Sequence, residues 1–400
     1  MNTREKALVA VAIILLVIGI AAGYGIGSSA APVKTVTETA TVTTTVGKAA
    51  ATVTVTKTVT AAGGKPAGKT YKFKIFTVFG KGDPYFNDIK YFVSLVKNLT
   101  NGAVVFEPYS CPELGIKLAE QLRALKAGTS EFGLVSTAFL PEDPVFPLTS
   151  SKPGPLSDVY DLYYYIKEEE DIIVKTFNKF GVVYVGPMYY RPETVAFRVP
   201  VHSIADMKGK IIRSAGLAAT FYKLLGLESV VMPGGELYTA LQTGSVDALE
   251  WTDWSSHYVN GFYELAKYVF EPVRGVNFHS EAYPMYLCAN PDAWNSLPED
   301  YKRAIRVAIY LTFFHAGYRQ DKAYQYYKQK CIKAGNVALK LPEEDFKKII
   351  EAGVQVHLIM AKKSPTCLEY VKRLIHIWRD LGYVEWANAL EQAMKKNGLI

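Results

Sequence analysis

The sequence predicts an α/β protein of two similar lobes with a long helix spanning both, preceded by a transmembrane anchor and a stalk. Strand and helix patterns alternate from residue 71 onward, the pattern of 124–135 returns at 240–251, and one helical pattern runs over 298–335. A chain of 400 residues is also too long for one small core. We assign residues 1–27 to an anchor or signal, 28–69 to a stalk, and 70–400 to the folded part.

The first segment predicts the compartment. Arg4 and Lys6 precede an uncharged apolar stretch over 7–27. A membrane-spanning helix needs roughly 20 such residues, whereas the core of a signal peptide has about 7–15. Positive charge on its N-terminal side would leave the remainder of the chain outside the cell. Small residues at 28–31 are compatible with cleavage of a signal peptide. The length of the apolar stretch instead favours an uncleaved membrane anchor with an extracytoplasmic domain.

The second segment has low complexity. Residues 33–69 are almost entirely Thr, Val, Ala and Gly, as in "TVTETATVTTTV". Such a composition cannot bury a core, despite the β-propensity of Thr and Val. We therefore predict an extended tether that lets the folded domain move a limited distance from the membrane.

The folded part begins with the first lobe, assigned to about 70–190 plus part of 283–335. Its expected elements are a strand at 71–80, a helix at 85–99, a strand at 103–110, a helix at 114–128 and a strand at 131–136. Such alternation predicts a sheet with crossover helices.

The second lobe, about 191–282 plus the C-terminal helices, has the same order. Its expected elements are a strand at 210–216, a helix at 217–226, a strand at 228–232, and a helix and a strand within 235–251. In both lobes a helix-ending glycine, Gly128 or Gly244, is followed three residues later by an acid, Glu131 or Asp247. Glycine suits the left-handed position after a helix end. The repeated pattern indicates two similar lobes.

A long helix follows the second lobe. Pro298, acidic residues in the first turn, and Gly335 beyond the end delimit a helix of about 55 Å, longer than one lobe is wide. Further helices are expected at 343–362, 367–381 and 384–396.

Composition excludes several functions. The formal charge of +7 is a modest excess without a dense Lys/Arg run, so no nucleic-acid partner is expected. The sequence has no GxSxG, HExxH or phosphate-loop motif, and the chain is predicted not to be an enzyme. The four cysteines lack metal spacing, and are either buried thiols or include one disulfide, with Cys331–Cys367 as the candidate pair.

Arg213 is the first candidate site residue. It ends the apolar strand "KIIR", and ligands of open α/β sheets bind at the carboxyl ends of strands. Its guanidinium either pairs with a carboxylate of its own lobe or forms a fork that holds the carboxylate of a ligand in two parallel hydrogen bonds.

Glu250 presents a similar choice. Burying this carboxylate without a partner would be costly, so it either pairs with a lysine or offers a hard oxygen to a cation, with Asp253 and Glu281 as further oxygens. Glu250 and Trp251 also depart from the repeated pattern, since the first lobe has Leu134 and Val135 at those places.

The segment that joins the lobes supplies three more candidates. Tyr190, Arg191 and Glu193 lie where the chain would cross from one lobe to the other, so a contact with ligand on the hinge side is expected.

These residues resemble a known family. The stretch "IADMKGKIIRSAG", continued by "ESVVMPGGELYTALQTGSVDALEW", is similar to the solute-binding proteins of TRAP transporters, of the DctP type, and the likeness covers about 71–381. The resemblance implies a periplasmic-binding-protein-like fold whose lobes close over an organic acid gripped by Arg213. It also implies delivery of that acid to TRAP membrane permease subunits driven by an ion gradient.

Within the family, "DALEW" resembles the branch that binds 2-oxo or 2-hydroxy acids or related monocarboxylates through a metal ion, Na⁺ or Ca²⁺. There the counterparts of Glu250, the Trp251 carbonyl and Glu281 hold the cation. That branch also has a glutamine about 21 positions before the arginine, where this chain has Pro192, and the neighbouring Glu193 is the candidate replacement.

Other possibilities stay open at this point. Some relatives dimerise through C-terminal helices, so a homodimer is expected as an option. The same module could serve as a sensor or scavenger without a permease, and an anchored surface enzyme or a structural envelope protein is the remaining alternative.

Overall fold

The computed structural model describes residues 34–46, 49–61, 68–156, 158–190, 193–232, 234–251, 253–271 and 283–400. These form two units, 1–67 and 68–400. In the first unit, β1 (Lys34–Val46) pairs antiparallel with β2 (Ala49–Ala61). The low-complexity sequence predicted a tether without this pairing, although alternating Thr and Val favour strands. The predicted anchor, 1–27, lies outside the described residues, and within them no helix is long and apolar enough to cross a membrane.

The first lobe is built on a five-stranded sheet of order β4-β3-β5-β12-β6. β3 runs parallel to β4 and β5, whereas β12 runs antiparallel to β5 and β6. The strands are β3 (Tyr71–Thr77), β4 (Val104–Ser110), β5 (Phe132–Val135), β6 (Val183–Tyr190) and β12 (Tyr283–Ala289). The helices of this lobe are α2 (Phe86–Leu99), α3 (Gln121–Lys126), α4 (Val145–Leu148), α5 (Val159–Lys179) and α9 (Pro291–Asn295). This is the predicted sheet with crossover helices, to which an antiparallel pair has been added.

The second lobe is built on a six-stranded sheet of order β13-β11-β7-β10-β8-β9. β8 runs parallel to β9 and β10, whereas β7 runs antiparallel to β10 and β11. The strands are β7 (Thr194–Phe197), β8 (Ile211–Arg213), β9 (Glu228–Val230), β10 (Ala248–Trp251), β11 (Tyr268–Phe270) and β13 (Val337–Leu339). The helices are α6 (Gly216–Leu224), α7 (Gly234–Thr243) and α8 (Trp254–Val259).

The repeated helix–glycine–strand pattern has the same structure in both lobes. Gly128 and Gly244 have φ values of 71° and 78°, the left-handed region that favours glycine. Glu131 accepts a hydrogen bond at 2.8 Å from the backbone N–H of Lys74, one residue before β3 begins to pair with β5. Asp247 accepts one at 2.9 Å from the backbone N–H of Ile211, the first residue of β8. Each acid therefore fixes the register of its strand, β5 or β10. The predicted equivalence of the two segments is confirmed.

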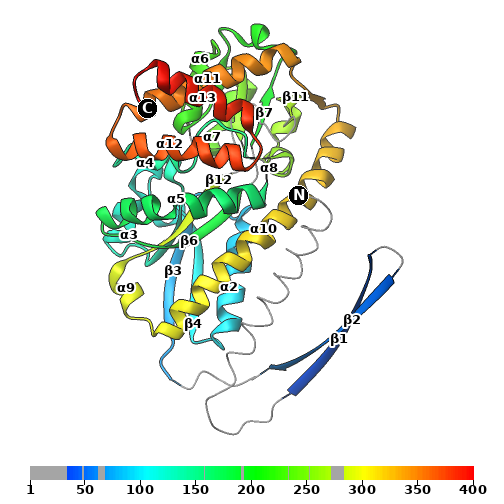
Figure 1. Ribbon diagram of the computed structural model, residues 1–400, viewed down its shortest axis with the longest axis vertical. Helices are drawn as coiled ribbons and strands as arrows, with labels where there is room; N and C mark the ends of the chain where they lie inside the picture. The colour runs from blue at the N-terminus through cyan, green and yellow to red at the C-terminus, as the bar shows by residue number, and fades with distance from the viewer. Residues whose placement is uncertain are drawn as a thin grey trace. The chain divides into compact units, whose positions relative to one another are not determined.

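The predicted long helix is α10 (Glu299–Lys333). At 1.5 Å per residue it is about 50 Å long. It packs on β6 and α2 of the first lobe and on α8 of the second, as its course past both sheets shows (Figure 1). Its buried residues, among them Ile305, Ile309 and Phe313, belong to a hydrophobic cluster that continues through both lobes.

Three C-terminal helices follow, namely α11 (Glu343–Ala361), α12 (Pro365–Asp380) and α13 (Val384–Lys396). α11 contacts α6 of the second lobe, whereas α12 packs on α4 and α5 of the first. The sequence assigned all three helices to the second lobe, whereas α11 and α12 contact different lobes and α13 packs on both of these helices.

Two sequence-based expectations are wrong. The helix expected over 114–128 is broken, because Gly115 adopts a φ of 66° after a short 3-10 turn and α3 begins only at Gln121. The candidate disulfide does not form, and all four cysteines are free and buried. Cys331 packs in the core of the second lobe, whereas Cys367 packs in a separate cluster with the C-terminal helices.

Candidate functional site

A cavity of about 950 Å³ lies between the lobes. The carboxyl ends of four strands open onto it, through Val78 after β3, Ser136 after β5, Arg213 of β8 and Trp251 of β10. Ligands of α/β sheets bind where carboxyl ends of strands converge. The carboxyl ends of strands from both sheets therefore lie at one cleft.

Arg213 lies at the wall of this cavity with only 4% of its surface exposed. Its Nη1 donates to the carbonyl of Glu250 at 3.0 Å and its Nε donates to the carbonyl of Met232 at 3.3 Å. The guanidinium carbon lies 4.6 Å from the ring centre of Trp251. These contacts fix the guanidinium plane and, among the residues that the structure describes, engage two of its five N–H groups, which leaves three for a ligand.

Glu250 lies beside Arg213 in the same wall and is 5% exposed. One carboxylate oxygen accepts from the backbone N–H of Ala215 at 3.2 Å. Burial raises the pKa of the Tyr222 hydroxyl well above its usual value, and the charges of Glu250 and Glu193 raise it further. Both carboxylates therefore lie within electrostatic range of one buried phenol.

Glu193 lines the cavity from the hinge side. The pairing of Trp251 with Thr194 places Glu193 one residue beyond the last pair of β7 and β10. Its Oε1 accepts from the Tyr283 hydroxyl at 3.2 Å. Because Tyr283 begins β12, this bond joins the two strands through which the chain crosses between lobes. The neighbouring candidate, Arg191, lies outside the described residues.

Trp251 contributes an aromatic wall to the cavity. Its ring meets Phe262 edge to face at 5.9 Å, and the Arg213 guanidinium lies over the ring. A Cβ added at Gly234 would lie 2.4 Å from the ring, so this glycine allows the indole to occupy its place. The guanidinium, the indole and the Glu250 carbonyl thus form one rigid unit.

The other predicted residues have different places. Tyr190 is buried behind the cleft, where its ring stacks on Tyr85 and Tyr283 and makes a tilted contact with Phe79. Burial raises its pKa. Asp253 caps α8 by accepting from the Ser255 backbone at 2.9 Å. Glu281 lies outside the described residues.

No metal centre is complete in the part of the chain that the structure describes. There, no three His, Cys, Asp or Glu side chains come together as a metal-binding group. The cleft nevertheless holds the carboxylates of Glu250 and Glu193, and such hard oxygens suit Na⁺ or Ca²⁺ rather than a thiophilic metal.

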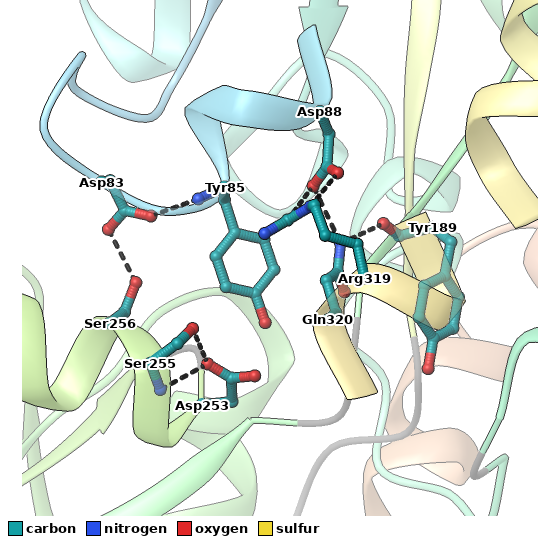
Figure 2. A network of polar contacts seen from close by, with 9 residues as sticks. All are labelled: Asp83, Tyr85, Asp88, Tyr189, Asp253, Ser255, Ser256, Arg319 and Gln320. Carbon is teal, nitrogen blue, oxygen red and sulfur yellow. Dashed lines mark hydrogen bonds and ion pairs between the residues drawn. The ribbon is translucent and has the colours of Figure 1, made fainter. Parts of the chain in front are cut away.

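Sequence reasoning missed Asp83, which follows β3 and lines the cavity. Figure 2 shows its two oxygens held from both lobes. One accepts from the Tyr85 backbone at 2.9 Å, and the other accepts from the Ser256 hydroxyl at 2.7 Å and the Asn260 amide at 3.2 Å. Burial raises the pKa of Asp83. Asp83 lies six residues beyond the end of β3, so the strand-end rule that selected Arg213, the last residue of β8, does not reach it.

A second contact joins the lobes at another part of the cleft. The Ser151 hydroxyl, from the loop after α4, accepts from the Leu217 backbone N–H in the first turn of α6 at 3.1 Å. A Cβ at Gly216 would lie 2.1 Å from that hydroxyl oxygen, and the φ of 57° at Gly216 also favours glycine. With the Asp83 contacts, this bond describes a closed arrangement of the lobes.

The remaining members of the network in Figure 2 attach α10 to the first lobe. Arg319 donates to both oxygens of Asp88 in α2, with Nε at 2.7 Å from Oδ1. Gln320 donates to Asp88 at 3.0 Å and to the Tyr189 carbonyl at 3.1 Å. None of these residues lines the cavity, so the group is structural.

Comparisons with known proteins agree with this architecture. The chain is 27% identical over 217 residues to a monocarboxylate 2-oxoacid-binding periplasmic protein of Nostoc sp., a match that covers 53% of this chain and 58% of that protein. The chain thus spans little more than half the length of this curated relative.

Solved structures show the same fold. One is a TRAP transporter solute-binding protein from Bordetella bronchiseptica, a mixed-occupancy dimer with calcium and picolinate. Its TM-score is 0.71 at 20% identity, and the match covers 83% of this chain and 98% of that chain. A counterpart from Pseudoalteromonas atlantica, with bound sodium and pyruvate, has a TM-score of 0.68 at 20% identity and covers 82% and 99%.

The profile of one family spans most of the folded unit. The DctP family, described as bacterial extracellular solute-binding protein family 7, matches residues 76–364. That range contains the described lining of the cleft, α10 and every strand of both sheets except most of β3. This chain belongs to the DctP family of extracellular solute-binding proteins.

Proposed function

We propose that this chain is an extracytoplasmic solute-binding protein that captures an organic acid between its lobes and delivers it to a TRAP-type permease. The acid is a 2-oxo or 2-hydroxy acid or a related monocarboxylate. The observation that carries the proposal is Arg213, a buried and fixed guanidinium that keeps three N–H groups for a ligand in an interlobe cleft. A guanidinium held in one plane matches a carboxylate in two parallel hydrogen bonds.

A metal ion fits the same wall. Glu250 and Glu193 would hold it, with the Trp251 carbonyl and Glu281 completing the set that family resemblance implies. The carboxylates of Glu250 and Glu193 bring negative charge to the wall of the cavity where an anionic ligand must enter. Bound Na⁺ or Ca²⁺ would offset that charge and contact the oxygens of the acid. The Nostoc relative and the Pseudoalteromonas structure, with 2-oxo acids in their names, support this choice of ligand.

Closure of the lobes completes the mechanism. Arg213 and Glu250 belong to the second lobe, whereas Phe79, Ile116 and Met285 line the first. An acid held by Arg213 touches the first lobe only when the cleft is closed. Ligand therefore shifts the population toward the arrangement in which Asp83 and Ser151 bind the second lobe, which a permease can recognise.

The assembly around the cleft is part of the proposal. Residues 1–27 anchor the chain in the membrane, and 28–69 tether the folded domain outside the cell. The chain acts by binding without catalysis, because the Arg213 fork in the described lining of the cleft suits capture of a carboxylate. A homodimer through the C-terminal helices remains an option, and the dimeric Bordetella structure gives a precedent.

Use as a sensor or scavenger without a permease is the second candidate, because the same cleft would serve either role. Uptake in vesicles distinguishes them. Vesicles that contain the permease should accumulate labelled ligand only when this protein is added, and binding without any stimulated uptake by a cognate permease would favour a sensor.

A thermal-shift screen tests the binding function. The folded domain is heated with 2-oxo acids, 2-hydroxy acids, dicarboxylates and aromatic acids, each with and without Na⁺ or Ca²⁺. We expect a rise in Tm with a monocarboxylate, larger when the cation is present, since a ligand that binds only the native state stabilises it. Absence of a shift with every acid, in protein that melts cooperatively, would contradict the proposal and favour a surface enzyme or a structural envelope protein.

A further inference from the structure

The cleft is larger and more apolar than a three-carbon acid requires. Pockets of about 300–1,000 Å³ suit drug-sized ligands, and this cavity of about 950 Å³ is at the upper end. Its apolar lining includes Phe79, Ile116 and Phe139 from the first lobe and Val231 from the second. A pyruvate-sized ligand at Arg213 would leave most of this surface facing water.

Several polar groups that the first lobe presents to the described part of the cavity are engaged within the protein. Asp83 accepts from Ser256 and Asn260, and the Ser151 hydroxyl accepts from Leu217. The backbone N–H and carbonyl of Ser136 bind the side chain of Gln121, at 2.9 Å and 3.1 Å. Apart from the Ser136 hydroxyl and the exposed Lys117, the described first-lobe lining therefore offers a ligand mainly apolar contacts.

Positive charge in the described lining is also unevenly placed between the two lobes. Arg213 is the buried cation of that lining, and the other cation, Lys117, is exposed at the first lobe. A second carboxylate on the ligand would thus meet either apolar surface or the solvated Lys117. Burying a charge in apolar surroundings is costly.

We propose that the ligand is an amphipathic monocarboxylate whose carboxylate lies at Arg213 and whose aliphatic or aromatic body lies against the first lobe. That body has on the order of five or more carbons, as a pocket of this size can hold. This rests on the proposed function and specifies its substrate class. Val231 is 65% exposed although it lines the cavity, and such a body would cover it.

A chain-length series measured by calorimetry tests this. Straight-chain 2-oxo acids from pyruvate to 2-oxooctanoate are titrated into the folded domain with Ca²⁺. Burial of each methylene is worth roughly a fourfold gain in affinity, so several methylenes should tighten binding by more than about tenfold. A further pair, 2-oxohexanoate and 2-oxoadipate, compares mono- and dicarboxylates of equal length, and the dicarboxylate should bind at least about tenfold more weakly.

Two variants locate the effect. Val231→Ser and Phe139→Ala should lower the ratio of 2-oxooctanoate to pyruvate affinity severalfold, whereas Tyr318→Ala, an exposed aromatic change on α10, should leave that ratio unchanged. Val231 is too exposed for its replacement to unfold the domain.

The outcomes separate the two proposals. Affinity that is flat or falls with chain length, or tighter binding of 2-oxoadipate, would overturn the amphipathic ligand and leave the binding function standing. If no acid of any length binds to folded protein, both proposals are overturned.

Discussion

At the scale of residues, the candidate site divides into groups that hold a ligand and groups that hold the lobes. Arg213 keeps donors for a ligand, whereas both oxygens of Asp83 are used within the protein. The sequence predicted Arg213 because a cation at a strand end is visible locally. Asp83 was not predicted because its partner Ser256 is 173 residues away, and no local pattern reports such a pair.

The Ser256 hydroxyl should matter for closure. In Ser256→Ala, Asp83 loses a donor from the other lobe, and a hydrogen bond to a charged group contributes about 1.5–3 kcal/mol. We expect ligand affinity to fall about tenfold or more. Ser255→Ala is the matched control, because the Ser255 hydroxyl donates to Asp253 within the same lobe and the change should leave affinity intact. Equal losses of affinity in both variants would contradict a role in closure.

Burial of His357 predicts a dependence of stability on pH. Its Nε2 lies 2.7 Å from the Pro153 carbonyl, and burial lowers its pKa from 6.5 to about 4. The unfolded chain therefore binds the extra proton first, so this contribution is present above pH 6.5 and is lost as pH falls toward 4.

Denaturation of His357→Gln measures that contribution. Between pH 7.5 and pH 5, the free energy of unfolding of wild type should lose roughly 2 kcal/mol more than that of the variant. His376→Gln, which replaces a histidine on α12 that is exposed, is the control and should follow wild type. A His357→Gln profile parallel to wild type would mean that His357 titrates alike in both states.

At the scale of elements, the sequence predicted most helices and strands because their signals are local. Gly128 and Gly244, with the acids that follow them, predicted the starts of β5 and β10. Pro298 and Gly335 predicted the two ends of α10. The helix over 114–128 failed because tertiary contacts decide there. Gly115 turns the chain, and the Gln121 side chain bonds the Ser136 backbone across the sheet edge.

The ion pair between Arg319 and the buried Asp88 contributes to the attachment of α10 to the first lobe. Arg319→Met would leave Asp88, which is fully buried, without its charged partner, at a cost of about 3 kcal/mol in the free energy of unfolding. Arg303→Met, which removes the exposed pair with Asp300 on the same helix, should change stability little. Equal effects in urea denaturation would show that the Asp88–Arg319 pair does not hold the helix.

At the scale of the whole domain, two sheets meet at one cleft, with α10 and the hinge strands joining them. The fold was predictable because the repeated motif specifies both lobes. The contents of the cleft were only partly predictable, since the side chains of Glu193 and Tyr283 meet there from positions 90 residues apart. The predicted site residues Arg191 and Glu281 and the anchor, 1–27, lie outside the described residues and stay predictions.

The central claim is that Arg213 grips the carboxylate of the ligand. Calorimetry with the tightest-binding acid tests this claim in wild type, Arg213→Lys and Arg198→Lys. Arg198 follows β7 and is not among the described residues that line the cavity, so Arg198→Lys is the control. A lysine keeps the charge but lacks the fork, so Arg213→Lys should bind at least about tenfold more weakly, with the control unchanged. Unchanged affinity in a folded Arg213→Lys protein, and in Arg213→Ala, would contradict the account.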